Sequence, residues 1–280
     1  MNEIRARRAG GRAARVSLRA APLEEAKRPV RPGMTGGTYR PLTDADMVRS
    51  HEAALQALEE IGLADAPQSG IDAMTAAGAT LGDDGRLRYP RALVEDMLAK
   101  AARSITLCGR DPAHDLQLAG QRVHFGTAGA AVHLVDAETG TYRDCTLEDL
   151  HHAARIADAL DNIHFVQRPM VARDVTDNRE LDINTIYACV AGTLKHVGTS
   201  FVERDFVPDA IDLLHMIAGG EAAWRARPFV SNTNCFVVPP MKFATESCQV
   251  MEACIRAGMP ILLLSAGQAG ATAPAPIAGA

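Results

Sequence analysis

The stretch Met259-Pro-Ile-Leu-Leu-Leu-Ser-Ala-Gly-Gln-Ala-Gly-Ala-Thr-Ala-Pro274 decides how the fold is interpreted. Residues 261–264 form an apolar run too short for a helix, which predicts a strand buried on both faces, as in a parallel sheet. The run then opens into a loop of small and polar residues over 265–272. Such a loop after a buried strand is how α/β proteins build the floor of a binding site, because glycine lets the backbone approach a ligand closely.

Composition narrows the class of protein. The chain has 280 residues, of which 47% are hydrophobic and 22% charged, and its net charge is −5. These values predict a soluble globular protein with a large core, and the acidic balance argues against a nucleic-acid-binding protein. No apolar run reaches the roughly 18 to 20 residues of a membrane-spanning helix, so no membrane partner is expected. The six cysteines form no C-x-x-C pair or zinc-ligand spacing, which predicts no metal site and a reducing cytoplasm.

Three regions are distinguished along the chain. Residues 1–38 are predicted to be a basic tail and linker, rich in arginine and ending in Pro and Gly. Residues 39–145 are predicted to form a helical and β-hairpin region, beginning with a helix over 43–61 that Thr43 and Asp46 cap. Residues 146–280 then alternate between apolar strands and amphipathic helices.

This alternation has a regular period. Predicted strands centre near residues 164, 198, 231 and 262, an interval of roughly 33 residues, which is typical of the βα units of a (β/α)₈ TIM barrel. The fold class is therefore predicted as α/β, with a partial (β/α)₈ barrel that contains the first half of the strands. A doubly wound sheet is the alternative, but the loop after residue 264 lacks the G-x-G-x-x-G pattern of nucleotide-binding sheets. Half a barrel leaves an unpaired edge on its last strand, so further βα units are expected beyond residue 280.

In such a fold the reactive groups lie where strands end and loops begin. The candidate substrate-binding residues at these points are Gln167, Thr199, Asn232, Asn234, Ser265 and Gln268. All are neutral and together offer hydrogen-bond donors and acceptors, which suits the orientation of a polar or cationic substrate. Each could instead support a neighbouring group or cap a loop. The sequence yields no Ser-His-Asp order, carboxylate pair or metal trio, and residues 203–205 are the clustered charges near this edge.

Several segments carry a resemblance to a known family. They are Tyr39-Arg-Pro-Leu-Thr-Asp, the helix beginning at His51-Glu-Ala-Ala-Leu, the segment Phe125-Gly-Thr-Ala-Gly and the glycine-rich stretch over 264–274. Together they resemble the trimethylamine methyltransferase family, and the glycine-rich stretch is the most specific of them.

The resemblance implies a (β/α)₈ barrel that moves a methyl group from trimethylamine or a related tertiary or quaternary amine to a corrinoid (cobalamin) on a separate corrinoid protein. It places Gly267 and Gly270 where the backbone would face that cofactor, with no cofactor bound tightly by the chain itself. The family position of pyrrolysine lies beyond residue 280, so the resemblance assigns no catalytic residue here. It also implies a cytoplasmic homo-oligomer at full length, and a role in methylamine metabolism and methanogenesis.

Three other interpretations remain open at this stage. The protein could be a glycine betaine methyltransferase of the type without pyrrolysine, which also uses a corrinoid protein. It could be another small-molecule TIM-barrel enzyme, such as a lyase or hydrolase. It could also be a catalytically inactive remnant of a barrel.

Overall fold

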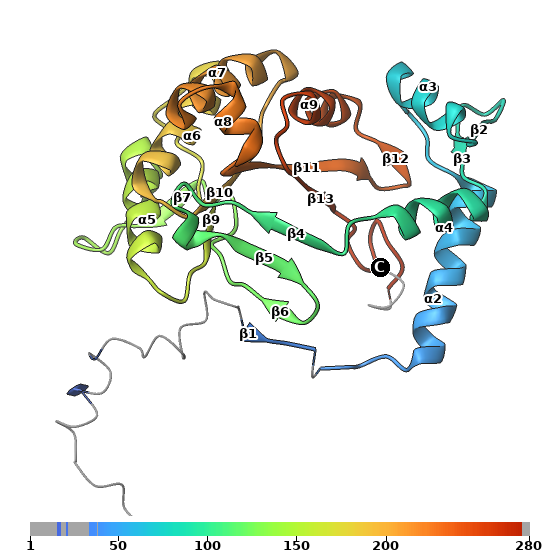
Figure 1. Ribbon diagram of the computed structural model, residues 1–280, viewed down its shortest axis with the longest axis horizontal. Coiled ribbons are helices and arrows are strands. Elements are labelled where there is room, and N and C mark those ends of the chain that lie inside the picture. The colour runs from blue at the N-terminus through green and yellow to red at the C-terminus, as the bar shows by residue number, and fades with distance from the viewer. Residues whose placement is uncertain (1–15, 18–20, 22–33, 38, 276–280) are drawn as a thin grey trace, which may run out of the picture.

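The computed structural model describes residues 16–17, 21, 34–37 and 39–275, so most of the predicted basic tail lies outside the described residues. The described chain combines a mainly parallel sheet, helices along it, and a separate group of helices and short hairpins (Figure 1). The mixed α/β class is therefore confirmed.

The central sheet contains the predicted strands as neighbours in sequence order. Its members are β9 (Phe165–Gln167), β10 (His196–Thr199), β11 (Val230–Val238), β12 (Lys242–Phe243) and β13 (Ile261–Ser265). Strand β10 pairs in parallel with β9 and with β11, and β11 pairs in parallel with β13. Strand β12 returns antiparallel to the end of β11. The sheet is open, because no sheet in the described residues closes into a barrel.

One more segment runs parallel to this sheet, along the outer edge of β9. Gly126 pairs in parallel with Phe165, and Ala131 pairs in parallel with Met170. Helix α5 (Leu147–Ala159) connects this segment to β9, as a crossover helix connects two parallel strands. The parallel arrangement thus begins at residues that the sequence analysis placed in the preceding hairpin region.

Helices α5, α6, α7 and α9 form an arc on one side of the sheet (Figure 1). The remaining bounds are α6 (Asn178–Gly192), η4 (Arg204–Phe206), α7 (Val207–Ala218), α8 (Glu221–Ala226) and α9 (Thr245–Arg256). The main apolar core lies between these helices and the strands, and contains the fully buried Val197, Val230 and Trp224. This burial of apolar surface is the main stabilising contribution to the layer.

The prediction that β13 is buried on both faces is wrong. Leu262 and Leu263 are each 53% exposed and Leu264 is 40% exposed. The reason is that β13 pairs with β11 alone, and no described strand pairs with its other edge. The apolar run predicts a strand correctly, but its burial depends on neighbours that the described chain does not supply.

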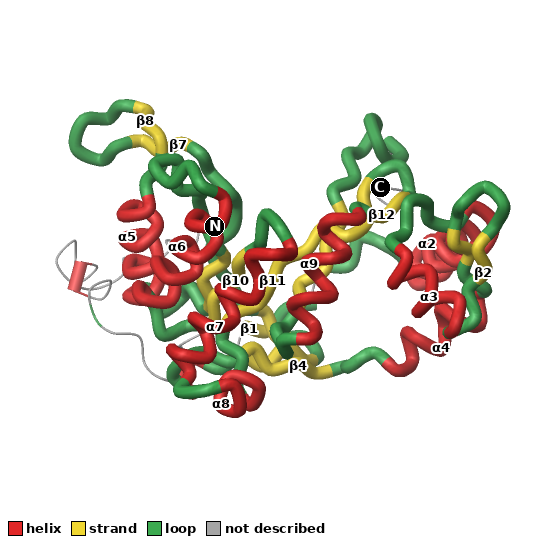
Figure 2. The backbone as a smooth tube through the Cα atoms, turned by 90° about the horizontal axis from the view of Figure 1, so that it is seen from above, coloured by secondary structure: helices red, strands yellow, loops and turns green. Residues whose placement is uncertain are grey.

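The N-terminal helices lie apart from α5, α6 and α7, with the sheet and α9 between the two groups (Figure 2). Their elements are α2 (Asp44–Gln56), a π-helical turn (Ala57–Ile61), α3 (Gln68–Ala76), β2 (Thr80–Leu81), β3 (Leu87–Arg88) and α4 (Arg91–Lys100). Strand β1 (Met34–Thr35) precedes them and pairs antiparallel with residues 122–123. The predicted capping box of α2 is confirmed, since the backbone N–H of Asp46 donates to Thr43 Oγ1 at 3.1 Å. Arg86 joins this group to the sheet by donating to the carbonyls of Gly62 (2.9 Å) and Met241 (3.0 Å).

Short hairpins fill the region before α5. They consist of β4 (Ser104–Leu107), η3 (Pro112–His114), β5 (Leu116–Ala119), β6 (Arg122–Val123), β7 (His133–Val135) and β8 (Tyr142–Asp144). Strand β4 pairs antiparallel with β5, and β7 with β8. The predicted strands of this region are therefore found as hairpins.

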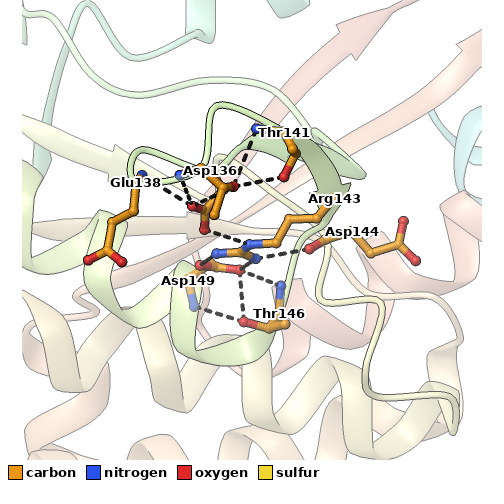
Figure 3. A network of polar contacts seen from close by, with 8 residues as sticks. Asp136, Glu138, Thr141, Arg143, Asp144, Thr146 and Asp149 are labelled. Atoms are coloured by element: carbon orange, nitrogen blue, oxygen red, sulfur yellow. Dashed lines mark hydrogen bonds and ion pairs between the residues drawn. The ribbon is translucent and has the colours of Figure 1, made fainter.

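Arg143 attaches the β7–β8 hairpin to the start of α5 (Figure 3). Its guanidinium donates two hydrogen bonds to Asp149, at 2.6 and 2.8 Å, and one to Asp136 at 3.1 Å. The same Asp149 completes the capping box with Thr146. The hydrogen bonds from Arg143 and Thr146 hold the pKa of Asp149 well below its ordinary value, so this carboxylate stays charged.

Replacing Arg143 tests this attachment. We expect Arg143→Met to lower the urea midpoint of unfolding, because the bidentate pair is lost while Asp149 keeps its charge. Urea unfolding followed by circular dichroism measures the change. Arg155→Met, on an exposed position of α5, is the control and should change stability by less than about 0.5 kcal/mol. An equal loss in both variants would contradict a specific role for Arg143.

Candidate functional site

Side chains of the parallel strands alternate between two faces of the sheet. Val166, Val197 and Val230 pack in the apolar clusters with the helices, which identifies the helix-facing side. The opposite side, called here the inward face, carries Phe165, Gln167, His196, Gly198, Ser231 and Thr233. This face holds no aspartate, glutamate, lysine or arginine on the three strands at these positions.

Gln167 is the best-defined polar group of the inward face. Thr233 Oγ1 donates to Gln167 Oε1 at 3.2 Å, and Thr127 Oγ1 donates to the Gln167 backbone carbonyl at 2.5 Å. Between them, Gly198 leaves the space that the Gln167 carboxamide occupies, since a Cβ there would overlap Gln167 Oε1. The carboxamide therefore crosses β10 from β9 to β11, and its Nε2 donates no hydrogen bond to any described residue.

His196 lies on the same face, two residues before Gly198, and is buried. Its Nδ1 is 2.8 Å from the Cys108 carbonyl oxygen, and its Nε2 is 3.0 Å from Ser231 Oγ. A carbonyl can only accept, so Nδ1 carries the proton and Nε2 accepts from the Ser231 hydroxyl. Burial lowers the pKa of His196 to about 4, so the imidazole is neutral at physiological pH.

Three of the predicted substrate ligands lie on the helix-facing side instead. Asn234 Nδ2 donates to the Ser247 carbonyl in α9 at 2.9 Å, which places its side chain against that helix. Asn232 shares this side by strand alternation and is 0% exposed, and its amide atoms have no hydrogen-bond partner among the described residues. Thr199 is also buried and shares the side of Val197.

The glycine-rich loop after β13 forms part of a large cavity. The cavity has a volume of about 1060 Å³ and lies between α2, the connection from β11 to β12, and this loop. Ser265, Gly267 and Thr272 line it. Gln268 is exposed and organises the loop through its backbone carbonyl, which accepts from the N–H groups of residues 271–273. Gly270 has φ +77°, a conformation that glycine adopts without strain.

Neither a metal-binding cluster nor a membrane-spanning helix is found in the part of the chain that the structure describes. No group of three or more His, Cys, Asp or Glu side chains there could hold a metal ion. Among the same residues, no helix is both long enough and apolar enough to cross a membrane. The six cysteines are all free thiols.

The structure brings Gln167 together with groups that sequence reasoning did not select. Gly198 and Thr233 lie one residue away from the predicted Thr199 and Asn232, on the opposite face of the sheet. Thr127 lies in the Phe125-Gly-Thr-Ala-Gly segment, which carried part of the family resemblance. That resemblance was the feature of the sequence from which Thr127 could have been selected. Nothing in the sequence indicated that Asn232 faces the helices, because residues 231–234 are polar on both faces of β11.

These features define a class of protein: an α/β protein whose parallel strands present a neutral, polar inward face, and whose loop after β13 lines a large cavity. The chain belongs to the trimethylamine methyltransferase family, because the family described as "Trimethylamine methyltransferase (MTTB)" matches it over residues 8–280. The resemblance inferred from the sequence is thus confirmed.

Relatives of established name extend this finding. The chain is 29% identical over 240 residues to a trimethylamine methyltransferase of Desulfitobacterium hafniense, covering 85% of this chain and 48% of the relative. It is 25% identical over 244 residues to a glycine betaine methyltransferase of the same species, covering 86% and 50%. A trimethylamine methyltransferase of Methanosarcina mazei is 25% identical over 242 residues, covering 85% and 49%. The chain spans about half the length of these relatives.

A substitution at Gly198 tests the geometry around Gln167. We expect Gly198→Ala to displace the Gln167 carboxamide and to destabilise the protein by about 1–3 kcal/mol, since the added Cβ overlaps a packed group. Thermal unfolding measures the loss, and a ¹⁵N–¹H spectrum reports the Gln167 side-chain amide. Gly70→Ala in α3, where an added Cβ meets only ordinary contacts, is the control and should stabilise by about 0.5–1 kcal/mol. An unshifted Gln167 amide in Gly198→Ala would contradict the crossing arrangement.

The buried His196 predicts a pH dependence of stability. The unfolded chain protonates this histidine below about pH 6.5, whereas the folded chain does not until about pH 4. Its folded pKa is depressed, so the free energy of unfolding should be highest above pH 6.5 and fall by up to ~3 kcal/mol as pH falls from 6.5 to 4. Urea unfolding at stepped pH measures the slope. His196→Gln should reduce the change in the free energy of unfolding between pH 6.5 and pH 4, whereas His51→Gln, at an exposed position, should not. An unchanged slope in His196→Gln would show that His196 does not cause the pH dependence.

Proposed function

We propose that this protein acts in the transfer of a methyl group from trimethylamine, or from a related tertiary or quaternary amine, to a cognate corrinoid protein. The family match over residues 8–280 is the observation that supports the proposal most strongly. The neutral inward face is consistent with it. A quaternary ammonium leaves as a neutral amine, so its nitrogen needs no proton and the site needs no strong general acid.

Glycine betaine is the second candidate substrate. A glycine betaine methyltransferase is among the relatives, at an identity close to that of the Methanosarcina enzyme. Glycine betaine carries a carboxymethyl group on a quaternary nitrogen, whereas trimethylamine is a tertiary amine without a carboxylate. Gln167 Nε2 is a hydrogen-bond donor, and a carboxylate oxygen is a group that it can bind. The choice between the two substrates is tested by the methyl-transfer assay.

In this proposal Gln167 orients the substrate at the inward face. Its oxygen is held by Thr233 and its backbone by Thr127, so the free amide group has a fixed direction. Such preorganisation lowers the cost of positioning a small substrate. Phe165 lies on the same strand face, two residues away, and its ring packs against Gly126 at the outer edge of β9.

The corrinoid would supply a strongly nucleophilic Co(I) that accepts the methyl group. The cavity between α2 and the glycine-rich loop fits an approach by such a group from outside. At about 1060 Å³ it is at the upper end of the volumes of ligand pockets and has mainly apolar walls, while Gly267 adds no side chain that would limit close approach. We infer that Ser265, Gly267 and Thr272 face the corrinoid protein in the complex.

We also propose that the open sheet is a portion of a (β/α)₈ barrel whose first strand is the segment at 126–131. That segment, β9, β10, β11 and β13 succeed one another in parallel order with helices on one side. In a complete (β/α)₈ barrel, leucines such as those exposed on β13 pack against the neighbouring βα unit. The free thiols are compatible with the cytoplasmic location that the sequence analysis expects.

Methyl transfer from each candidate amine tests the proposed activity. The protein from the complete gene is mixed with a reduced corrinoid protein and either trimethylamine or glycine betaine, and the cobalt absorption spectrum is followed. Transfer from at least one amine is expected. We expect Gln167→Leu to lower kcat/KM about tenfold to a hundredfold, because one oriented hydrogen bond is lost.

Gln56→Leu on the exposed surface of α2 is the matched control and should leave kcat/KM unchanged. Loss of transfer from glycine betaine alone in Gln167→Leu would assign the amide group to the carboxylate. The absence of transfer from every methylated amine would reject the proposed activity.

A further inference from the structure

A buried carboxylate behind the carboxyl edge of the sheet is not used by the proposed chemistry. Asp182 lies in α6, is 2% exposed, and is the one buried acidic side chain in the described part of the chain. Its Oδ2 accepts a hydrogen bond from the backbone N–H of Val202 at 2.8 Å. Val202 lies in the loop that follows β10, three residues after the strand ends. Asp182 therefore holds the first part of this loop against α6.

A second loop of the same edge contributes a charge to this carboxylate. Arg168 follows the last residue of β9, and its backbone N–H donates to the Gly198 carbonyl at 2.9 Å. Its guanidinium is largely buried and acts on Asp182 and Cys189, both on α6, through charge rather than through a hydrogen bond. The guanidinium therefore lies toward α6, on the side of the sheet away from Gln167.

The charges around Asp182 oppose one another. The pKa of Asp182 is raised to about 6, mainly by burial and in smaller part by the nearby Glu203, against the lowering effects of the Val202 N–H and the Arg168 charge. Arg204 and Asp205 in η4 form an exposed ion pair with each other at 3.4 Å. Asp182 is thus at the balance point between its charged and neutral forms near pH 6.

The loop held by Asp182 borders a pocket at the same edge of the sheet. Residues 202–205 line it on one side, and Glu246 and Gln249 of α9 line it on the other, with a volume of about 480 Å³. A change in the position of Val202 would therefore change the access to this edge between β10 and α9.

We propose that Asp182 is a positioning residue that holds the loops after β9 and β10 in one arrangement, and that its protonation releases the β10 loop. The charged carboxylate accepts the Val202 N–H strongly and balances the buried Arg168. The neutral acid is a weaker acceptor and leaves Arg168 buried without a counter-charge, which favours movement of the loop. The relevance of this loop to methyl transfer rests on the proposed function, but its release does not.

The exchange of the Val202 backbone amide with deuterium tests the proposal without an activity assay. After correction for intrinsic rates, Val202 should exchange about thirtyfold faster at pH 5 than at pH 7.5, because the neutral fraction of a carboxyl group with a pKa of about 6 rises from about 3% to about 90% over that range. The Val202 amide shift should titrate with a midpoint near pH 6.

Asp182→Asn keeps an acceptor oxygen of the same shape and removes the titration, so it should abolish this pH dependence. Glu203→Gln should lower the midpoint, since it removes a like charge, and the exposed Asp205→Asn should not change it. A Val202 shift that is flat from pH 5 to pH 7.5 in the unaltered protein would overturn the proposal, as would a pH dependence that survives in Asp182→Asn. If the unaltered protein shows the Val202 titration but transfers no methyl group from any amine, the proposed function is rejected and the role of Asp182 stands.

Discussion

The structure depends on one strand that is covered on both faces, β10. On the helix-facing side Val197 is fully buried in the main core. On the inward face His196 is buried, and the Gln167 carboxamide fills the space over Gly198. A parallel strand in this position must satisfy its polar side chains internally, because water does not reach them. His196 does so through Cys108 and Ser231, which ties the first hairpins and β11 to the same strand. The crossing of Gln167 over Gly198 is possible only because the rest of β10 is fixed in this way.

Regular spacing made much of this fold predictable. Four apolar runs about 33 residues apart could be assigned as parallel neighbours, since each βα unit needs a similar length of chain. The segment at 126–131 escaped this reasoning because the β7–β8 hairpin separates it from α5, and its glycine and alanine residues give no apolar run. The exposure of β13 was equally hidden. An apolar strand indicates burial only when its partners are present, and partners cannot be inferred from the strand itself.

The sequence predicted some positions along the strands but not the side of the sheet that each residue faces. Gln167 and Thr199 are the last residues of β9 and β10, as predicted, whereas Asn232 and Asn234 lie within β11 and not at its end. Which of two adjacent residues faces inward depends on strand alternation, and in β11 the run from Ser231 to Asn234 is polar at every position. No apolar residue within that run sets the phase. Packing of Val230 against the helices decides it, and this places Thr233 inward and Asn232 toward α9.

The distribution of charge across the sheet bears on how the proposed reaction would be helped. On the described strands, the inward face is neutral, since Gln167 and Thr233 are uncharged and the buried His196 keeps a low pKa. The ionised groups of this edge, Arg168 and Asp182, lie on the side of α6. A cationic amine bound at a neutral face lacks the solvation that water would give its charge. Loss of the methyl group removes the positive charge from nitrogen, so the same environment penalises the substrate more than the departing amine. A carboxylate on the inward face would stabilise the cation instead and raise the barrier, which gives a physical reason for keeping Asp182 behind the sheet.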